Sequence, residues 1–311
     1  MLRTIKPGAT IAVIAPAFPP DAQKLTKGIR YLKDLGYHII EGESLSAKEK
    51  YFAGSDALRA NEINRFFADA QVDALFCARG GWGTLRILDK LDYANIRKNP
   101  KALVGYSDIT TLQLALWHKS GIPSVSGPMV AVEMGSGIVP FTEQHFWAQI
   151  QNEASWYTFR FDCKDEVQIW NEGRAKGRLI GGCLSMLVHQ LGTPYMPELS
   201  GQILFLEDVG EEPYKIDRYL AQLYQAGVFD KISGLILGQF IDCEDSNPAR
   251  VHISVKDILR DYFERIKCPV VFNFPYGHGM RKFSMPVGVR AELVTEKCTL
   301  MVENPFFSEI F

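Results

Sequence analysis

The sequence predicts an α/β protein: a Rossmann-like parallel sheet domain with helices on both faces, followed by a smaller mixed α+β domain. Three observations support this class. In the first half, short apolar runs alternate with amphipathic stretches, as in parallel sheets covered by helices. The second half is richer in strand-like runs. The length of 311 residues exceeds that of one ordinary core and favours two domains.

The first half supplies strands and helices with recognisable ends. Its strand-length apolar runs are 11–15, 37–40, 74–78 and 102–104. A helix over 22–35 ends before Gly36, because glycine suits the left-handed position after a helix. A helix over 56–70 begins after Ser55, a favourable N-cap, and a further helix covers 109–118. These elements predict a βαβ domain of four or five strands.

The alternation lapses between residues 137 and 170, which we interpret as the crossing between two domains. A helix-like stretch over 142–151 precedes alternating aromatic residues that we expect at buried strand positions, Trp156, Tyr157, Phe159 and Phe161. The second half contains strand-like runs over 201–206, 234–237, 270–272, 287–293 and 299–302. Its expected helices cover 184–191, 213–226 and 254–265. We therefore predict domains over 1–140 and 176–311, joined by 141–175.

The composition excludes several classes of protein. The formal net charge is −2 and no basic run occurs, so neither nucleic acid nor an anionic membrane is an expected partner. No signal-peptide core or membrane-spanning run is present, which predicts a cytoplasmic protein. The cysteines lie tens of residues apart, and we expect reduced thiols at Cys77, Cys163, Cys183, Cys243, Cys268 and Cys298. The scattered histidines give no metal-binding motif, so the sequence predicts no metal and no cofactor.

Ser107 is the first candidate for chemistry. It lies where the apolar run 102–104 breaks at Gly105 and turns into the helix over 109–118. A serine on such a strand-to-helix turn presents its hydroxyl above the sheet edge, as a nucleophile does. Because the full G-x-S-x-G pattern is missing, a simple N-cap is the competing interpretation.

Two further residues could complete a catalytic triad. His278 follows the strand over 270–272 between Gly277 and Gly279, which leave its ring accessible, although a loop histidine without a role is the alternative. Glu207 ends the strand-like run over 201–206, and it could orient His278 rather than serve only as a helix-dipole partner. Because ligand crevices form beyond the carboxyl ends of parallel strands, all three side chains could converge there.

A glycine turn follows the strand over 74–78, with the sequence Arg79-Gly80-Gly81-Trp82-Gly83-Thr84. Its bare amides could supply one oxyanion donor beside the amide of Asp108. The competing phosphate-loop interpretation lacks the Walker lysine and the G-x-G-x-x-G spacing. We expect Arg79, Gly80 and Trp82 to contact substrate. Arg79 is a candidate for binding a substrate carboxylate, and it could equally tie the turn to an acid.

Together these stretches resemble the LD-carboxypeptidases, a serine peptidase family that includes the microcin C self-immunity peptidases. The matching segments span nearly the whole chain, and they are 6–8 with 15–16, 79–84, 105–110, 181–185, 206–208 with 217–218, 277–278 and 286–288. The resemblance implies a triad of Ser107, Glu207 and His278 and an oxyanion hole formed by Asp108 and Gly81. It also implies a homodimer. One departure is Cys183, where the family usually has asparagine; a nucleophilic role for Cys183 is the less favoured alternative.

The resemblance implies a cytoplasmic serine peptidase that releases the terminal D-alanine from murein tetrapeptides during peptidoglycan recycling, through an acyl-enzyme on Ser107. One alternative is the immunity branch of the same family, which cleaves aminoacyl-nucleotide conjugates. A second alternative, from a different class, is a small-ligand binding module without catalysis. The murein peptide is thus the expected partner.

Overall fold

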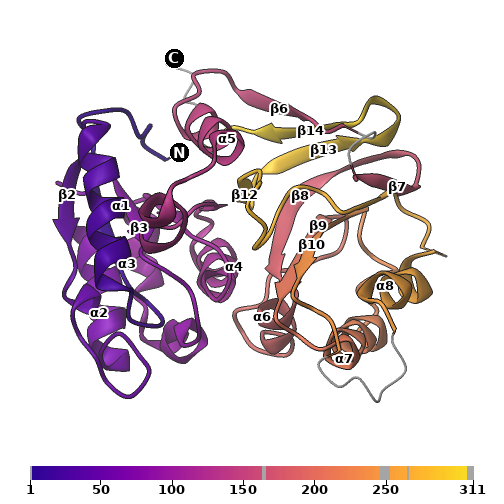
Figure 1. Cartoon of the computed structure of the whole chain (residues 1–311), viewed down its shortest axis with the longest axis horizontal. Coiled ribbons are helices and arrows are strands. Elements are labelled where there is room, and N and C mark those ends of the chain that lie inside the picture. Colours follow the sequence, from indigo (N-terminus) through magenta and orange to yellow (C-terminus); the bar gives the residue numbers. More distant parts are fainter. Residues whose placement is uncertain (1, 163–165, 246–252, 265, 307–311) are drawn as a thin grey trace.

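Two β-sheets flanked by helices organise the chain (Figure 1). The computed structural model describes residues 2–162, 166–245, 253–264 and 266–306. The first half of the chain builds most of one sheet, and the second half builds the other. In Figure 1 the two halves lie side by side, with helix α4 (Ile109–Ser120) between them.

Among the described residues the first sheet has six strands, in the order β12-β5-β4-β3-β1-β2. Their bounds are β1 (Thr10–Ile14), β2 (His38–Glu41), β3 (Ala74–Cys77), β4 (Ala102–Val104), β5 (Ser124–Ser126) and β12 (Met285–Val287). Strands β1 to β5 run parallel, whereas β12 pairs antiparallel with β5. Strands β3 and β4 are wholly buried, as expected for central parallel strands with both faces covered.

The second sheet has eight strands among the described residues, in the order β6-β14-β13-β8-β9-β10-β11-β7. Their bounds are β6 (Trp156–Arg160), β7 (Gln168–Asn171), β8 (Arg174–Cys183), β9 (Ile203–Val209), β10 (Gly234–Ile241), β11 (Val270–Phe272), β13 (Arg290–Val294) and β14 (Thr299–Glu303). The centre, β8 to β11, is parallel, and the remaining pairings are antiparallel. This sheet is therefore mixed.

Several helices begin at a residue whose side chain caps them. Their bounds are α1 (Ala22–Asp34), α2 (Asp56–Ala68), α3 (Tyr93–Lys98), α5 (Pro140–Ile150), α6 (Leu184–His189), α7 (Pro213–Gln225) and α8 (Val255–Phe263), with a 3-10 helix over Thr84–Lys90 and a π-helical turn over Val130–Met134. The Ser55 hydroxyl accepts the Leu58 amide at 3.1 Å, so the predicted N-cap of α2 is confirmed.

Helix α4 joins the two cores. It is apolar on nearly all sides, because Leu112 packs in the core of the first sheet while Leu114 packs in the core of the second. Its neighbours in the second half include β8 and α6. The first turn of α4 is bonded to the second half as well, since the Cys183 amide donates to the Thr110 hydroxyl at 3.1 Å.

The α/β class predicted from the sequence is confirmed, with two differences in strand ends. The run 201–206 continues as β9 to Val209, so Glu207 lies inside the strand rather than at its end. The run 287–293 divides into β12 and β13 because the chain turns at Gly288, with φ +89°. The division into domains over 1–140 and 176–311 stays a prediction.

The prediction of reduced cysteines is wrong at one described position. Cys77, Cys183, Cys243 and Cys268 carry free thiols, whereas Cys298 is disulfide-bonded. The amide of Phe161 donates to the Cys298 carbonyl at 2.9 Å, so the chain beyond β6 passes beside a cysteine far away in sequence. The spacing of cysteines along the sequence does not reveal which distant segments lie side by side in the fold. Cys163 lies outside the described residues.

Within the part of the chain that the structure describes, no helix has both the length and the apolar composition that a bilayer crossing requires.

Candidate active site

Ser107 occupies a strained turn between β4 and α4. Its backbone is left-handed, with φ +67°, a conformation that costs a residue other than glycine about 1–2 kcal/mol. The Thr110 amide donates to the Ser107 carbonyl at 2.9 Å, so the helix starts immediately behind the serine. Strain of this kind is typical of a nucleophile elbow, where the chain turns sharply to expose the hydroxyl.

The glycine turn after β3 packs directly against this serine. A Cβ atom added to Gly80 would lie 2.9 Å from the Ser107 Cβ, 3.1 Å from its Oγ and 3.3 Å from the Asp108 amide nitrogen. Only glycine allows this approach. At Gly81 an added Cβ would instead meet the Phe18 ring at 2.5 Å. The structure thus places Gly80, with Gly81 next to it, beside the serine and the predicted oxyanion donor.

Side chains that the sequence analysis missed hold this turn in place. The Asp108 carboxylate accepts the Thr84 amide at 3.0 Å, and the Thr84 hydroxyl donates to the Asp108 carbonyl at 2.6 Å. The guanidinium of Arg59, which is 1% exposed, donates to the carbonyls of Pro16 (2.6 Å) and Gly83 (3.0 Å) and pairs with Asp56. These bonds fix the backbone amides of the turn relative to α4.

A sequence signal for Arg59 exists. It lies four residues before Ile63 and seven before Phe66, so it shares the buried face of α2 with them. An arginine on an apolar helix face must find buried acceptors, and here these are carbonyls next to the candidate site.

Glu207 and His278 form a hydrogen-bonded pair. The His278 Nδ1 lies 2.7 Å from the Glu207 Oε2, and the side chains are 16% and 0% exposed. A Cβ atom at Gly277 would lie 2.7 Å from that same oxygen, so a glycine is required for the loop to come this close. The carboxylate therefore binds one ring nitrogen and leaves Nε2 of the imidazole for another partner.

The elbow and the histidine loop meet at Tyr106. Its ring lies 4.9 Å from the His278 ring, centroid to centroid, in an edge-to-face arrangement. Tyr106 immediately precedes Ser107, so this contact brings the loop carrying His278 against the turn carrying the serine. The structure thus bonds Glu207 on β9 to His278 on the loop after β11, and it places that loop against the residue preceding Ser107, in the turn between β4 and α4.

Cys183 is a poor candidate nucleophile. Burial, together with the charges of Asp208 and Glu207, raises the pKa of its thiol well above the usual range, so the reactive thiolate is disfavoured. Its Sγ lies 3.3 Å from the Asp208 Oδ1. Burial and the neighbouring Glu207 charge in turn raise the pKa of Asp208 to about 6. Cys183 is the residue of β8 paired with Glu207 of β9, and Asp208 follows Glu207 on that strand.

The predicted substrate contacts occupy the rim of the glycine turn. Arg79 is half-buried, its Nε donates to the adjacent Gly80 carbonyl at 3.3 Å, and its guanidinium lies 5.7 Å from the Phe18 ring centroid. It makes no ion pair with an acid among the described residues. The Trp82 ring lies 6.3 Å from the His189 ring of α6, so it faces the second half of the molecule.

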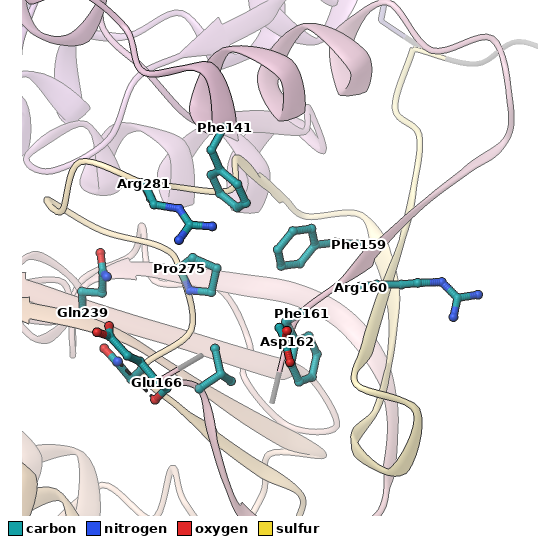
Figure 2. A pocket seen from close by; sticks show the side chains of 11 residues that line it. Phe141, Phe159, Arg160, Phe161, Asp162, Glu166, Gln239, Pro275 and Arg281 are labelled. Carbon is teal, nitrogen blue, oxygen red and sulfur yellow. Dashed lines mark hydrogen bonds between the residues drawn. The ribbon is translucent and has the colours of Figure 1, made fainter. Parts of the chain in front are cut away.

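A cavity of about 610 Å³ lies on another side of the histidine loop (Figure 2). Figure 2 shows Phe141 and Phe159 along one wall, with Pro275 and Arg281 from the loop itself. None of the three triad candidates lines it. In the described part of the chain, no three His, Cys, Asp or Glu side chains gather as metal ligands would.

Comparison with known proteins places these features in a family. Residues 11–127 match the sequence model of the LD-carboxypeptidase N-terminal domain, and residues 176–293 match that of the C-terminal domain. A Bacillus subtilis protein named "Probable murein peptide carboxypeptidase" is 35% identical over 97% of this chain and 93% of its own. The Escherichia coli protein "Microcin C7 self-immunity protein MccF" is 27% identical over 94% of this chain and 92% of its own.

A solved structure agrees with these matches. The crystal structure of muramoyltetrapeptide carboxypeptidase from Oxalobacter formigenes superimposes with a TM-score of 0.84 at 32% identity, covering 97% of this chain and all of that one. The similarity therefore extends over both sheets and over every segment that contributes to the candidate site. The chain belongs to the LD-carboxypeptidase family.

Proposed function

We propose that this protein is a serine carboxypeptidase that releases the terminal D-alanine from murein tetrapeptides through an acyl-enzyme on Ser107. The observation that carries the proposal is the 2.7 Å hydrogen bond between Glu207 and His278, on a loop that packs against the strained turn of Ser107. The names of the Bacillus and Oxalobacter relatives support the murein substrate.

The proposed chemistry follows from these positions. Ser107 Oγ attacks the carbonyl carbon that precedes D-alanine while His278 Nε2 accepts the hydroxyl proton. Glu207 holds the opposite ring nitrogen and stabilises the imidazolium. His278 then protonates the departing amine of D-alanine, leaving an ester on Ser107. Water, deprotonated by the same imidazole, hydrolyses that ester and regenerates the serine.

The amides beside Ser107 would stabilise the developing oxyanion. We assign this role to the Asp108 and Gly81 amides, as the sequence predicts, and the proximity of Gly80 to the Asp108 nitrogen supports a donor at this position. Arg79, Gly80 and Trp82 would contact the substrate, with Arg79 available for the terminal carboxylate because no acid among the described residues pairs with it.

The test is mass spectrometry of a murein tetrapeptide incubated with the purified protein or with Ser107→Ala. Loss of one alanine with the wild-type protein alone supports the proposal. An aminoacyl-sulfamoyl nucleoside, offered in parallel, tests the immunity-type alternative that the Escherichia coli relative suggests. A purine platform at Trp170 is disfavoured, since that ring stacks on Phe272 at 4.5 Å. If neither compound is cleaved, the small-ligand binding module is the remaining alternative.

The location and the assembly belong to the same proposal. We place the enzyme in the cytoplasm as a homodimer. Four free thiols support the location, whereas the disulfide at Cys298 is unusual for that compartment. Cell fractionation with detection of the protein by antibody tests the location, and recovery outside the cytoplasmic fraction would contradict it. Light scattering of the purified protein measures its mass against 35.0 kDa for one chain.

A further inference from the structure

A buried ion pair links the histidine loop to the first half of the molecule. Lys282, 3% exposed, lies four residues after His278. Its ammonium binds the carboxylate of Glu133, whose side chain is 12% exposed and belongs to the π-helical turn over Val130–Met134. The second carboxylate oxygen of Glu133 accepts the Met129 amide at 2.9 Å. Neither Glu133 nor Lys282 takes part in the steps of the proposed reaction.

Tyr106 connects the pair to the catalytic groups. Its hydroxyl donates to Glu133 Oε1 at 2.8 Å, and the Lys282 ammonium lies 4.1 Å from its ring centroid. The same ring touches His278. The loop therefore contacts Tyr106 at two points four residues apart, and Tyr106 is covalently joined to Ser107.

The charges of the cluster are settled by its surroundings. Burial would raise the pKa of Glu133, but Lys282, the Met129 amide and the Tyr106 hydroxyl outweigh burial, so the pKa lies below its usual range. Burial and the Glu133 charge raise the pKa of Tyr106 well above its usual value. Glu133 is thus a carboxylate and Tyr106 a hydroxyl donor, which is the arrangement that the hydrogen bonds require.

We propose that the Glu133–Lys282 pair, acting through Tyr106, is a positioning device that fixes His278 relative to Ser107. This inference rests on the proposed triad. Buried ion pairs contribute little net stability compared with apolar side chains of the same size. They do fix geometry, because separating the two partners would leave each with an unpaired buried charge. Proton transfer between Ser107 and His278 depends on such geometry, and a displacement of about 1 Å can cost on the order of 10²-fold in rate.

The test compares Lys282→Met and Tyr106→Phe with a matched control, Lys101→Met. Lys101 is also a buried lysine, at 4% exposure, but it donates to the carbonyls of Phe66 and Asp69 and touches no group of the candidate site. For Lys282→Met we expect kcat on the tetrapeptide to fall about 10- to 100-fold with KM within about twofold of wild type. Lys101→Met should lower the unfolding temperature and leave kcat unchanged.

A double variant separates positioning from stability. Lys282→Met leaves the Glu133 charge buried without its partner, which destabilises the fold. Adding Glu133→Gln removes that charge, so the unfolding temperature should recover while kcat stays low. Tyr106→Phe keeps the ring and loses only the hydroxyl, and we expect it to reduce kcat several-fold. If Lys282→Met fails to fold, Tyr106→Phe provides the test instead.

The outcomes are distinguishable from failure of the proposed function. If Ser107→Ala is inactive while folded Lys282→Met and Tyr106→Phe retain the wild-type kcat, the positioning role is overturned and the triad stands. Recovery of kcat together with stability in the double variant would also overturn it. If Ser107→Ala retains turnover, the triad itself fails. A low kcat with unchanged KM in folded variants supports the positioning role.

Discussion

Ser107 is the residue whose backbone conformation and proposed chemistry are most closely tied. Serine at φ +67° is strained, and the strain persists because β4, α4 and the packed glycine turn fix the chain on all sides. The strained backbone therefore serves to expose the hydroxyl and does not stabilise the fold.

Two substitutions separate these effects. Ser107→Ala should lower turnover about 10³-fold or more without unfolding the protein. Ser107→Gly should be equally inactive yet more stable than Ser107→Ala by up to about 1 kcal/mol, because relief of about 1–2 kcal/mol of strain exceeds the extra flexibility of unfolded glycine, about 0.5–1 kcal/mol. Urea unfolding measures the difference. A less stable glycine variant would contradict the strain.

Asp208 predicts an unusual dependence of stability on pH. Its pKa is raised from 3.8 to about 6, so between these values the folded protein holds a proton that the unfolded chain has released. The free energy of unfolding therefore falls as the pH rises through this window, by up to about 3 kcal/mol from this group. Asp208→Asn removes the effect.

Unfolding of wild type and Asp208→Asn at pH values from 4 to 8 tests this. The stability of the wild type relative to the variant should decrease as the pH rises toward about 6 and then level off. A constant difference across the range would mean that the Asp208 pKa is not raised.

The sequence suggested the candidate triad through its position near strand ends, and the structure pairs Glu207 with His278 and places the His278 ring against Tyr106. The sequence did not reveal the pair of Glu133 and Lys282. Each is an ordinary charged residue in the sequence, and only the fold brings these positions, 149 residues apart, together. Arg59 could have been found, since it interrupts the apolar face of α2. When the two residues of an ion pair lie far apart in the chain, no local sequence pattern indicates that they will pair.

At the scale of elements, the glycine turn after β3 matters because it is anchored at one end and packs against Ser107, the proposed nucleophile, at the other. Asp108 and Arg59 hold its far end, while Gly80 lies against the serine. The position of its amides is therefore tied to the position of α4, and substrate oxygen would meet donors that need no rearrangement.

Gly80→Ala should reduce kcat/KM by about 10²-fold, because its methyl group would collide with Ser107 at 2.9 Å. The control is Gly192→Ala, which adds the same methyl group where nothing lies within 4 Å, at φ +78°. This control should lose about 1 kcal/mol of stability and keep full activity. Equal activity of the two variants would show that the turn is not at the site.

Some elements escaped the sequence analysis for physical reasons. The sequence of β5, Ser124-Val125-Ser126, has one apolar residue, yet it is fully buried because its edges pair with β4 and β12. Strand β8 includes charged residues and glycines, so it shows neither an apolar run nor a regular alternation. In both strands tertiary pairing overrides weak local preference.

At the scale of the whole molecule, neither half is complete without the other. Helix α4 needs apolar partners from both cores, and the first sheet takes its last strand, β12, from the second half. The sequence predicted the class of fold but not this exchange, since Val287 of β12 falls in the run 287–293, which reads as one ordinary second-half strand.

Residues 1–150 expressed alone should therefore fail to unfold cooperatively and should bind an apolar dye, because α4 and the β5 edge lack their partners. Mixing them with residues 151–311 should restore hydrolysis of the tetrapeptide. Differential scanning calorimetry of the first fragment provides the check. A sharp transition for that fragment by itself would show that the halves fold independently.

The pairing of β5 with β12 also has a consequence for biosynthesis. The hydrogen bond between Ser126 and Tyr276 joins positions 150 residues apart, so the ribosome releases the first sheet long before its closing strand. Contacts this distant in sequence form slowly, and the waiting edge is open to wrong partners. Throughout this interval the nascent chain carries Ser107 without His278, the base of the proposed triad. In the proposed mechanism, hydrolysis can therefore begin only after His278 and the strand β12 (285–287) have been synthesised, which keeps shorter nascent chains from acting as peptidases.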